Sequence, residues 1–216
     1  MNRIVARALC ALCFLALAPP VLADPGGFHV RGGLVTSTFV IFGDSSGFAD
    51  LAGSGDVGFA VGGGGMLPLG DRSALQIEAM YVNKGGRLVV DSSFLSVGLT
   101  VGYVEFPVTF RYEFPTGNVR PYALAGLSLG VKLHSSSSDT LILDLLDIGA
   151  ADDLLRSTVG NAVLGAGLAF DNSRWSFEIR ANIGLTDAFE SRIEGSPVEP
   201  WKTKLNAFHF LVGYGF

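Results

Sequence analysis

Hydrophobic and polar residues alternate in eight segments of this chain. In residues 175–186, each odd position up to 185 carries an apolar side chain and each even position a polar residue or glycine. Because successive side chains of a strand point to opposite faces, this pattern predicts a β-strand with one apolar face. The same period occurs, with varying regularity, at residues 28–40, 57–69, 74–84, 104–114, 119–133, 158–170 and 207–216.

The connections between these segments differ in length in a regular way. Residues 70–73, 115–118 and 171–174 are tight and rich in Gly, Pro, Asn or Asp, which favour turns. Residues 41–56, 85–96, 134–157 and 187–204 form longer connections. Short and long connections therefore alternate. This predicts an all-β, antiparallel, up-and-down arrangement of eight strands, with both chain termini at the same end of the sheet as the short connections.

Composition indicates where such a sheet would lie. Charged residues make up 16% of the chain, against about 25% in average soluble proteins. After the first 23 residues, no apolar run approaches the roughly 20 residues that a membrane helix needs. Alternating strands that show one face to lipid fit both facts, and closure into a transmembrane β-barrel leaves no unpaired edge in hydrocarbon. Short periplasmic turns and long external loops then follow.

A soluble eight-stranded barrel of the lipocalin kind is the alternative, with its apolar face inside. Its outer face would carry many solvated charges. The minority face of these segments is instead rich in Gly, Ser, Ala and Tyr, with isolated charges. Such residues suit the confined interior of a small barrel, so the transmembrane interpretation is favoured.

The first 23 residues have the pattern of a cleavable signal peptide. Arg3 and Arg7 precede an apolar run, and Val21-Leu22-Ala23 provides a small-residue cleavage site. We expect residues 1–23 to be removed on export and residues 24–216 to form one barrel domain. Both cysteines lie in this segment, so the mature chain can form no disulfide. Without the two arginines, 13 basic residues face 20 acidic ones, which argues against nucleic acid as a partner.

Three stretches of the chain have a specific pattern. Residues 103–112 read YVEFPVTFRY, residues 75–81 read LQIEAMY and lead into Lys84-Gly85, and residues 120–126 read RPYALAG. Together with Gly32-Gly33-Leu34 and the terminal Phe216, these stretches resemble the small outer-membrane β-barrel domain family, which includes porin-like and PorT-like proteins and barrels of the OmpA/OmpX type. The resemblance implies a bacterial outer-membrane location, but the family has no single shared activity.

The C-terminal segment also resembles the signal that barrel-assembly machinery reads during insertion. Its alternating residues are Phe208, Phe210, Val212, Tyr214 and Phe216. The same side chains are expected to face lipid and to contribute to an interfacial aromatic girdle, and the two roles are compatible.

Charged residues on the inward face predict a lumenal charge network, with His29 and His209 beside it. Its members are Arg31, Glu78, Glu105, Arg111, Glu113, Arg120, Lys132, Glu178 and Arg180. The hairpin at residues 115–118 should bring Glu105, Arg111 and Glu113 opposite Arg120. The network either pairs within itself or lines a water channel. Eight strands leave an interior that side chains just fill, so the filled lumen is favoured.

Two features near the loops suggest other roles. His134 and Ser136 with Asp144 or Asp147 could form an esterase triad, but a triad is defined by geometry and such matches arise easily in a serine-rich loop. In Asp139–Leu155, leucines at helical spacing indicate one of two arrangements: a helix that contacts an external partner, or a loop that folds over the barrel mouth. The folded loop is favoured.

No metal or cofactor motif is found. The acids of the loop match no EF-hand, and Gly62–Gly65 lies inside a strand and therefore forms no phosphate-binding loop. Pro107 cannot donate to a sheet ladder, so a β-bulge is expected near it. We interpret the chain as a non-enzymatic envelope scaffold or surface-interaction protein in outer-membrane lipid. A narrow porin or solute channel is the alternative, and a lipid-modifying hydrolase is a less favoured third.

Overall fold

Eight antiparallel strands close into one barrel. A computed structural model of the chain describes residues 27–42, 53–90, 95–114, 117–137, 156–170, 173–187 and 202–216. The strands are β1 (Phe28–Phe42), β2 (Gly53–Pro68), β3 (Ser73–Val90), β4 (Leu95–Glu113), β5 (Val119–Ser137), β6 (Thr158–Phe170), β7 (Trp175–Gly184) and β8 (Lys202–Gly215). Each strand pairs with the next, and β8 pairs with β1, for example at Val35–His209. The predicted fold is confirmed.

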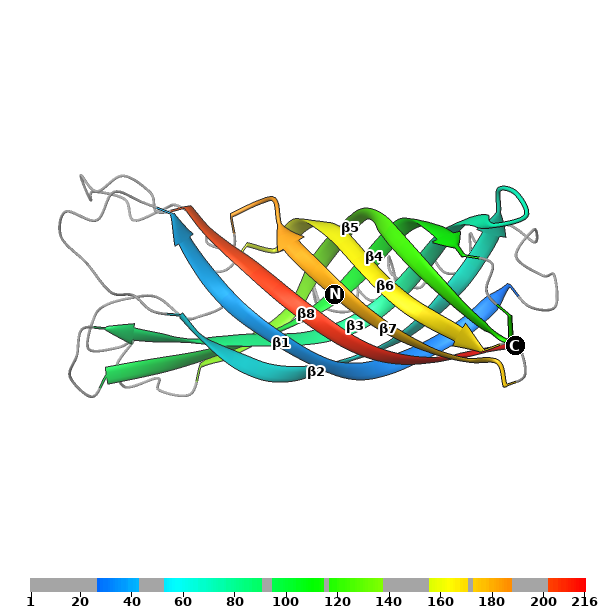
Figure 1. Cartoon of the computed structure of the whole chain (residues 1–216). Coiled ribbons are helices and arrows are strands. Elements are labelled where there is room, and N and C mark those ends of the chain that lie inside the picture. The colour runs from blue at the N-terminus through cyan, green and yellow to red at the C-terminus, as the bar shows by residue number, and fades with distance from the viewer. Residues whose placement is uncertain are drawn as a thin grey trace, which may run out of the picture.

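The two ends of the barrel differ. One end, here called the turn end, holds the three tight connections after β2, β4 and β6 together with Phe28 and Phe216 (Figure 1). The opposite end, here called the loop end, carries the remaining connections. The N–H of Phe216 donates to the Phe28 carbonyl over 2.9 Å, so the first and last strands are joined at the turn end. No described residue belongs to a helix long and apolar enough to cross a membrane.

One connection differs from the prediction. Residues 85–96 were expected to form a long external loop, but β3 continues to Val90 and β4 begins at Leu95, with Val90 paired to Leu95. Only residues 91–94 lie between the two strands. The alternation breaks down at Gly85-Gly86, so the apolar pattern no longer marks the strand beyond that point. Figure 1 shows β3 and β4 reaching past the loop-end limits of β6 and β7.

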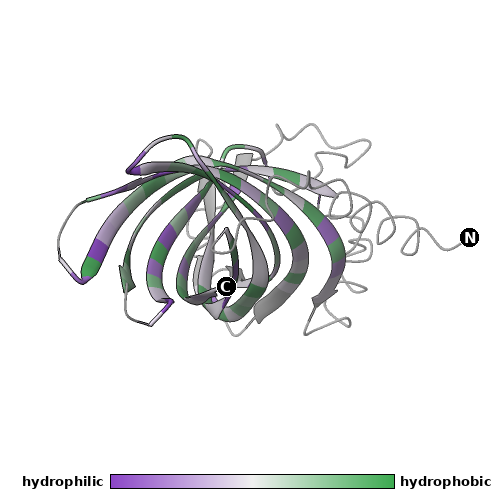
Figure 2. Cartoon of the chain, turned by 90° about the vertical axis from the view of Figure 1, so that its right-hand side faces the viewer, coloured by the Kyte–Doolittle hydropathy of each residue, from purple (hydrophilic) through white to green (hydrophobic). Residues whose placement is uncertain are grey.

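The two faces of the wall have opposite character. Large apolar side chains are exposed on the outside of all eight strands, among them Leu34, Phe110, Leu129, Ile179 and Phe208. Charged and polar side chains on the same strands point inward and are buried. Figure 2 shows the resulting alternation of hydrophilic and hydrophobic residues along the strands. This arrangement is the reverse of a soluble barrel, and lipid explains the exposed apolar surface.

Aromatic side chains mark two levels on the outer surface. At the turn end, Trp175 packs edge-to-face with Tyr214 at 5.2 Å between ring centroids. Toward the loop end, the His134 ring stacks on Tyr81 and lies against Gly102. On β4, Gly102 and Tyr112 bound a stretch that spans about 25 Å along the barrel axis, at roughly 3.3 Å per residue and a tilt of about 40°. Outer-membrane barrels have an apolar band of about this height.

Small residues make room for the side chains inside. A Cβ on Gly62 would lie 2.2 Å from the Ala79 carbonyl oxygen, and one on Gly64 would lie 2.1 Å from that of Ile77. Both glycines therefore permit a close approach between β2 and β3 that no other residue allows. The Gly62–Gly65 run is part of the barrel wall, in agreement with the sequence.

The bulge expected near Pro107 is absent. Pro107 pairs with Ser128 on β5, and the β3–β4 pairs on either side of it have one register. The missing N–H interrupts the ladder toward β3 without displacing the strand. Register shifts occur instead between Gly102 and Tyr103 on the β4–β5 pair and between Gly55 and Ala60 on the β2–β3 pair.

Candidate functional site

A cluster of buried charges occupies the middle of the lumen. Period-two alternation turns Arg31 of β1, Glu78 of β3, and Glu178 and Arg180 of β7 to the inside. Arg180 Nη2 lies 2.6 Å from Glu78 Oε2, and Arg31 Nε lies 3.3 Å from Glu78 Oε1. Both guanidinium groups also pair with Glu178. We call these four residues the central quartet.

Neighbouring polar groups complete the central quartet. His29 Nε2 lies 2.7 Å from Glu78 Oε1, and the Tyr122 hydroxyl donates to Glu178 Oε2 over 2.8 Å. Arg31 Nη2 donates to Gln76 Oε1 over 3.2 Å. Two arginines face two glutamates, so the quartet is formally neutral. Burial of these ions is tolerated because each is both paired and hydrogen-bonded.

The central quartet crosses the whole lumen. Strands β3 and β7 are four places apart in a ring of eight and therefore lie diametrically opposite each other. The Glu78–Arg180 ion pair joins them directly. This side-chain contact spans the diameter of the lumen at this level. Such a contact is possible because an eight-stranded barrel has a narrow interior.

Two further groups of contacts lie toward the loop end. Glu105 of β4 pairs with Lys84 of β3 and accepts a hydrogen bond of 3.0 Å from Asn182 of β7. Ser37 of β1 bonds both to the Gly85 carbonyl, at 2.6 Å, and to the Gly85 N–H, at 2.9 Å. Between these levels and the quartet lies a buried apolar cluster of Val35, Ala60, Met80, Val82, Ala207 and Leu211.

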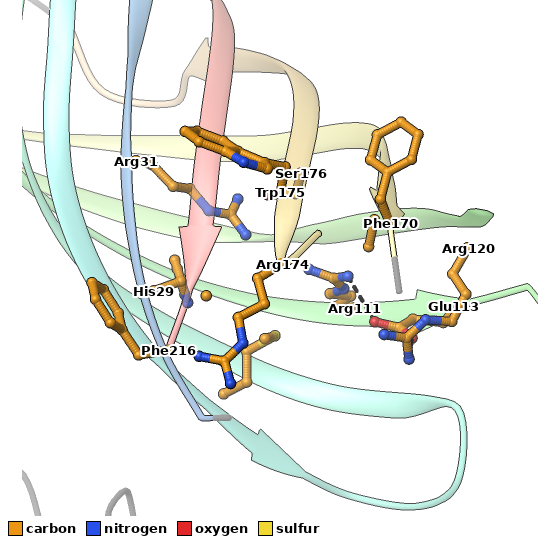
Figure 3. Close-up of a pocket in the computed structure, with 13 residues that line it drawn as sticks. His29, Arg31, Arg111, Glu113, Arg120, Phe170, Arg174, Trp175, Ser176 and Phe216 are labelled. Atoms are coloured by element: carbon orange, nitrogen blue, oxygen red, sulfur yellow. Dashed lines mark hydrogen bonds and ion pairs between the residues drawn. The ribbon is translucent and has the colours of Figure 1, made fainter. Parts of the chain in front are cut away.

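The turn end of the lumen is more open. Glu113 accepts bonds from Arg111 Nη2 at 2.7 Å and from Arg120 Nη1 at 3.0 Å. The Arg111 guanidinium also lies 3.6 Å above the centre of the Tyr122 ring. Arg111, Glu113 and Arg120 border a cavity of about 420 Å³, here called the turn-end cavity, which is lined in addition by His29, Arg31, Met66, Ala169, Phe170, Arg174, Trp175, Ser176, Gly215 and Phe216 (Figure 3).

The charged residues named from the sequence fall into separate groups. Arg31, Glu78, Glu178 and Arg180 meet in the central quartet, while Arg111, Glu113 and Arg120 meet at the turn end. Glu105 was expected beside the latter group, but it pairs with Lys84 instead. Lys132 and His209 are buried, whereas the side chain of Arg120 is 46% exposed.

Several residues of the lumen were missing from the network expected from the sequence. Lys84 and Asn182 lie on inward positions of their strands and could have been included by extending the alternation. Tyr122 also faces inward, yet an aromatic residue gives no sign that its hydroxyl bonds to a carboxylate. Arg174 belongs to a tight turn and is exposed, as expected, but it also lines the turn-end cavity.

The groups considered for catalysis do not come together among the described residues. His134 lies on the outer face of the wall, stacked on Tyr81, and Ser136 is exposed near the end of β5. Asp144 and Asp147, together with the rest of Asp139–Leu155, lie outside the described residues, as does the expected signal peptide, residues 1–23. Within the described ranges, no group of three or more His, Cys, Asp or Glu residues could hold a metal ion.

The fold and the apolar outer wall define a class, the small transmembrane β-barrels of the bacterial outer membrane. A family model described as the outer membrane protein beta-barrel domain matches residues 26–190. The chain belongs to this family, and its location is the bacterial outer membrane. No curated protein matches the sequence significantly.

Solved structures share the fold at low sequence identity. The outer membrane protein OprG from Pseudomonas aeruginosa aligns with a TM-score of 0.52 and 12% identity, covering 89% of this chain and 97% of that chain. Neisserial surface protein A aligns with a TM-score of 0.50 and 14% identity, covering 88% of this chain and 97% of that chain. At such identities the similarity concerns the fold alone.

Proposed function

We propose that this protein is a non-enzymatic outer-membrane barrel that acts as an envelope scaffold or surface-interaction protein and does not conduct solutes. The observation that carries the proposal is the ion pair of Glu78 and Arg180, which joins opposite walls of the lumen at 2.6 Å. The Glu105–Asn182 bond supports it as a second crossing closer to the loop end.

The loop end supports a role at the cell surface. Strands β3 and β4 contain 18 and 19 residues, whereas β6 and β7 contain 13 and 10. Since all are anchored at the turn end, the longer strands extend farther outward. With the turns on the periplasmic side, this part of the sheet projects from the outer surface, where it can contact an external partner.

Planar-bilayer recording of the purified protein tests the closed lumen. We expect no discrete conductance steps from wild-type protein whose folded state is verified by its heat-dependent mobility on gels. A narrow solute channel predicts steps under the same conditions, and their reproducible appearance would contradict the proposal. The matched variant Arg180→Ala removes the crossing side chain, and any conductance gained there would show that this pair closes the lumen.

A further inference from the structure

Three aromatic rings form a row on the outer face of the wall, toward the loop end. Phe59 of β2 lies 5.6 Å from Tyr81 of β3, measured between ring centroids. Tyr81 lies 6.4 Å from His134 of β5, and the planes of these two rings differ by only 13°. The two rings are therefore nearly parallel. We call Phe59, Tyr81 and His134 the aromatic row.

Gly102 of β4 allows the row to lie close to the sheet. A Cβ at this position would lie 2.3 Å from His134 Cε1 and 2.9 Å from the Tyr81 hydroxyl oxygen. Both rings therefore reach over the β4 backbone, where a larger residue would displace them. Rings that are already held in place lose little conformational entropy when a ligand packs on them.

Small polar side chains lie beside and beyond the aromatic row on the same face. Directly paired residues share a face, and Asn83 pairs with Gly102, which pairs with His134. Two residues farther toward the loop end, Thr100 of β4 pairs with Ser136 of β5, again on this face. Ser136 is exposed, and Asn83 and Thr100 are half-buried. The wall thus changes from aliphatic side chains to rings, and then to amide and hydroxyl groups.

This combination of groups suits a sugar better than an acyl chain. The face of an aromatic ring carries negative partial charge and attracts the C–H groups on the face of a pyranose. Hydroxyl and amide side chains both donate and accept hydrogen bonds, as the hydroxyl groups of a sugar require. An acyl chain would leave the polar side chains without a partner. Gly102 marks the loop-end limit of the apolar band, so the row adjoins the layer of lipid headgroups outside it.

We propose that the aromatic row and the polar side chains beyond it bind a sugar in the headgroup of an outer-leaflet glycolipid. The pyranose face packs on Tyr81 and His134, and its hydroxyl groups bond to Asn83 and Ser136. The inference rests on the proposed surface role and names the chemistry of the partner. It is tested apart from the closed lumen, because these residues lie on the outer wall and bilayer conductance reports only on the interior.

Glycolipid binding by the folded full-length protein in non-ionic detergent tests this site. The probe is a lipopolysaccharide with a short core, and native mass spectrometry counts the molecules that stay bound as its concentration rises. Phosphatidylethanolamine, which has no sugar, is the control lipid. We expect saturable retention of one lipopolysaccharide per barrel at concentrations where the control lipid is lost. Retention no better than that of the control lipid would overturn the proposal.

Matched variants separate the aromatic row from general contact with lipid. Tyr81→Ala and Tyr112→Ala remove the same side chain from opposite ends of the apolar band. Tyr81→Ala should weaken lipopolysaccharide binding about fivefold, as the loss of one aromatic contact does, whereas Tyr112→Ala should change it less than about twofold. His134→Ala alters an exposed side chain and should match Tyr81→Ala. Equal losses in Tyr81→Ala and Tyr112→Ala, or no loss in either variant of the row, would overturn the proposal.

The core oligosaccharide without its lipid distinguishes the source of the sugar. Weaker binding of this probe, with the same dependence on Tyr81 and His134, would support a sugar contact that the membrane anchor strengthens. An oligosaccharide that binds while the intact lipopolysaccharide does not would overturn the glycolipid as the occupant and identify glycans outside the membrane instead. Heat-dependent mobility on gels verifies that each variant is folded.

Discussion

The middle of the lumen and its turn end hold the same residue types under different conditions. In the central quartet two arginines meet two glutamates, and the four side chains are almost completely buried. At the turn end, Arg111 and Arg120 both pair with Glu113, whose side chain is 23% exposed, next to a cavity of about 420 Å³. The quartet is balanced and buried, whereas the turn end is partly open to solvent.

This difference separates two uses of buried charge. Paired ions that satisfy one another in a confined space hold the barrel walls together and leave nothing for a ligand. Ions that lie beside open volume keep part of their hydration, so their pairing contributes less to stability. A charged barrel interior is therefore not sufficient reason to infer a channel, because the balance and spacing of the charges decide what they do.

Removing one carboxylate from each region should give the largest contrast. Glu178→Ala leaves Arg31 and Arg180 with one glutamate in a dry environment, and the free energy of unfolding should fall by about 3–5 kcal/mol. Glu113→Ala affects a partly solvated group, and the loss should be about 1 kcal/mol or less. Urea titration of folding into lipid vesicles measures both. Similar losses would mean that the two regions are equally solvated.

Adding volume to each region should give a smaller contrast. Gly64→Ala places a methyl group 2.1 Å from a backbone oxygen of β3, so strands must move apart at a cost of about 1–3 kcal/mol. Ala169→Val adds volume beside the turn-end cavity and should cost less than about 1 kcal/mol.

Gly32→Ala serves as the control for an alanine that meets no obstacle, because its nearest neighbour would be 3.7 Å away. The same vesicle titration compares the three variants. If Ala169→Val proves as costly as Gly64→Ala, the turn end is as tightly packed as the middle, and the contrast in volume does not exist.

Alternation predicted the faces of the barrel well because it is a local property. Whether Glu78 or Ile77 points inward depends only on the strand to which both belong, and the structure places them on opposite faces as expected. The eight-stranded fold followed when the alternation of short and long connections was considered together with the strand pattern. The apolar pattern failed to predict the strand ends beyond Gly85, where β3 and β4 continue although the alternation has stopped.

The partners inside the barrel were harder to predict because they depend on closure. Glu78 and Arg180 are far apart in the sequence and meet only because the sheet closes with β3 opposite β7. Glu105 and Arg111 lie on the same strand, yet Glu105 pairs with Lys84 from β3 instead. The place of Arg174 in the lining of the turn-end cavity depends on how its turn folds, which the alternation of residues does not show.

The smallest expected effect concerns Glu113→Gln, which keeps the shape of the side chain and its capacity to accept hydrogen bonds from Arg111 and Arg120. Because the Glu113 side chain is 23% exposed, the free energy of unfolding should fall by about 0.5 kcal/mol or less. Glu178→Gln is the matched change in the quartet, and it should cost more because it removes a charge from a dry ion-pair network. Vesicle titration at low and high ionic strength measures both variants, and salt should reduce the difference between wild type and Glu113→Gln. Equal losses in the two variants would show that the turn end is no more solvated than the middle of the lumen.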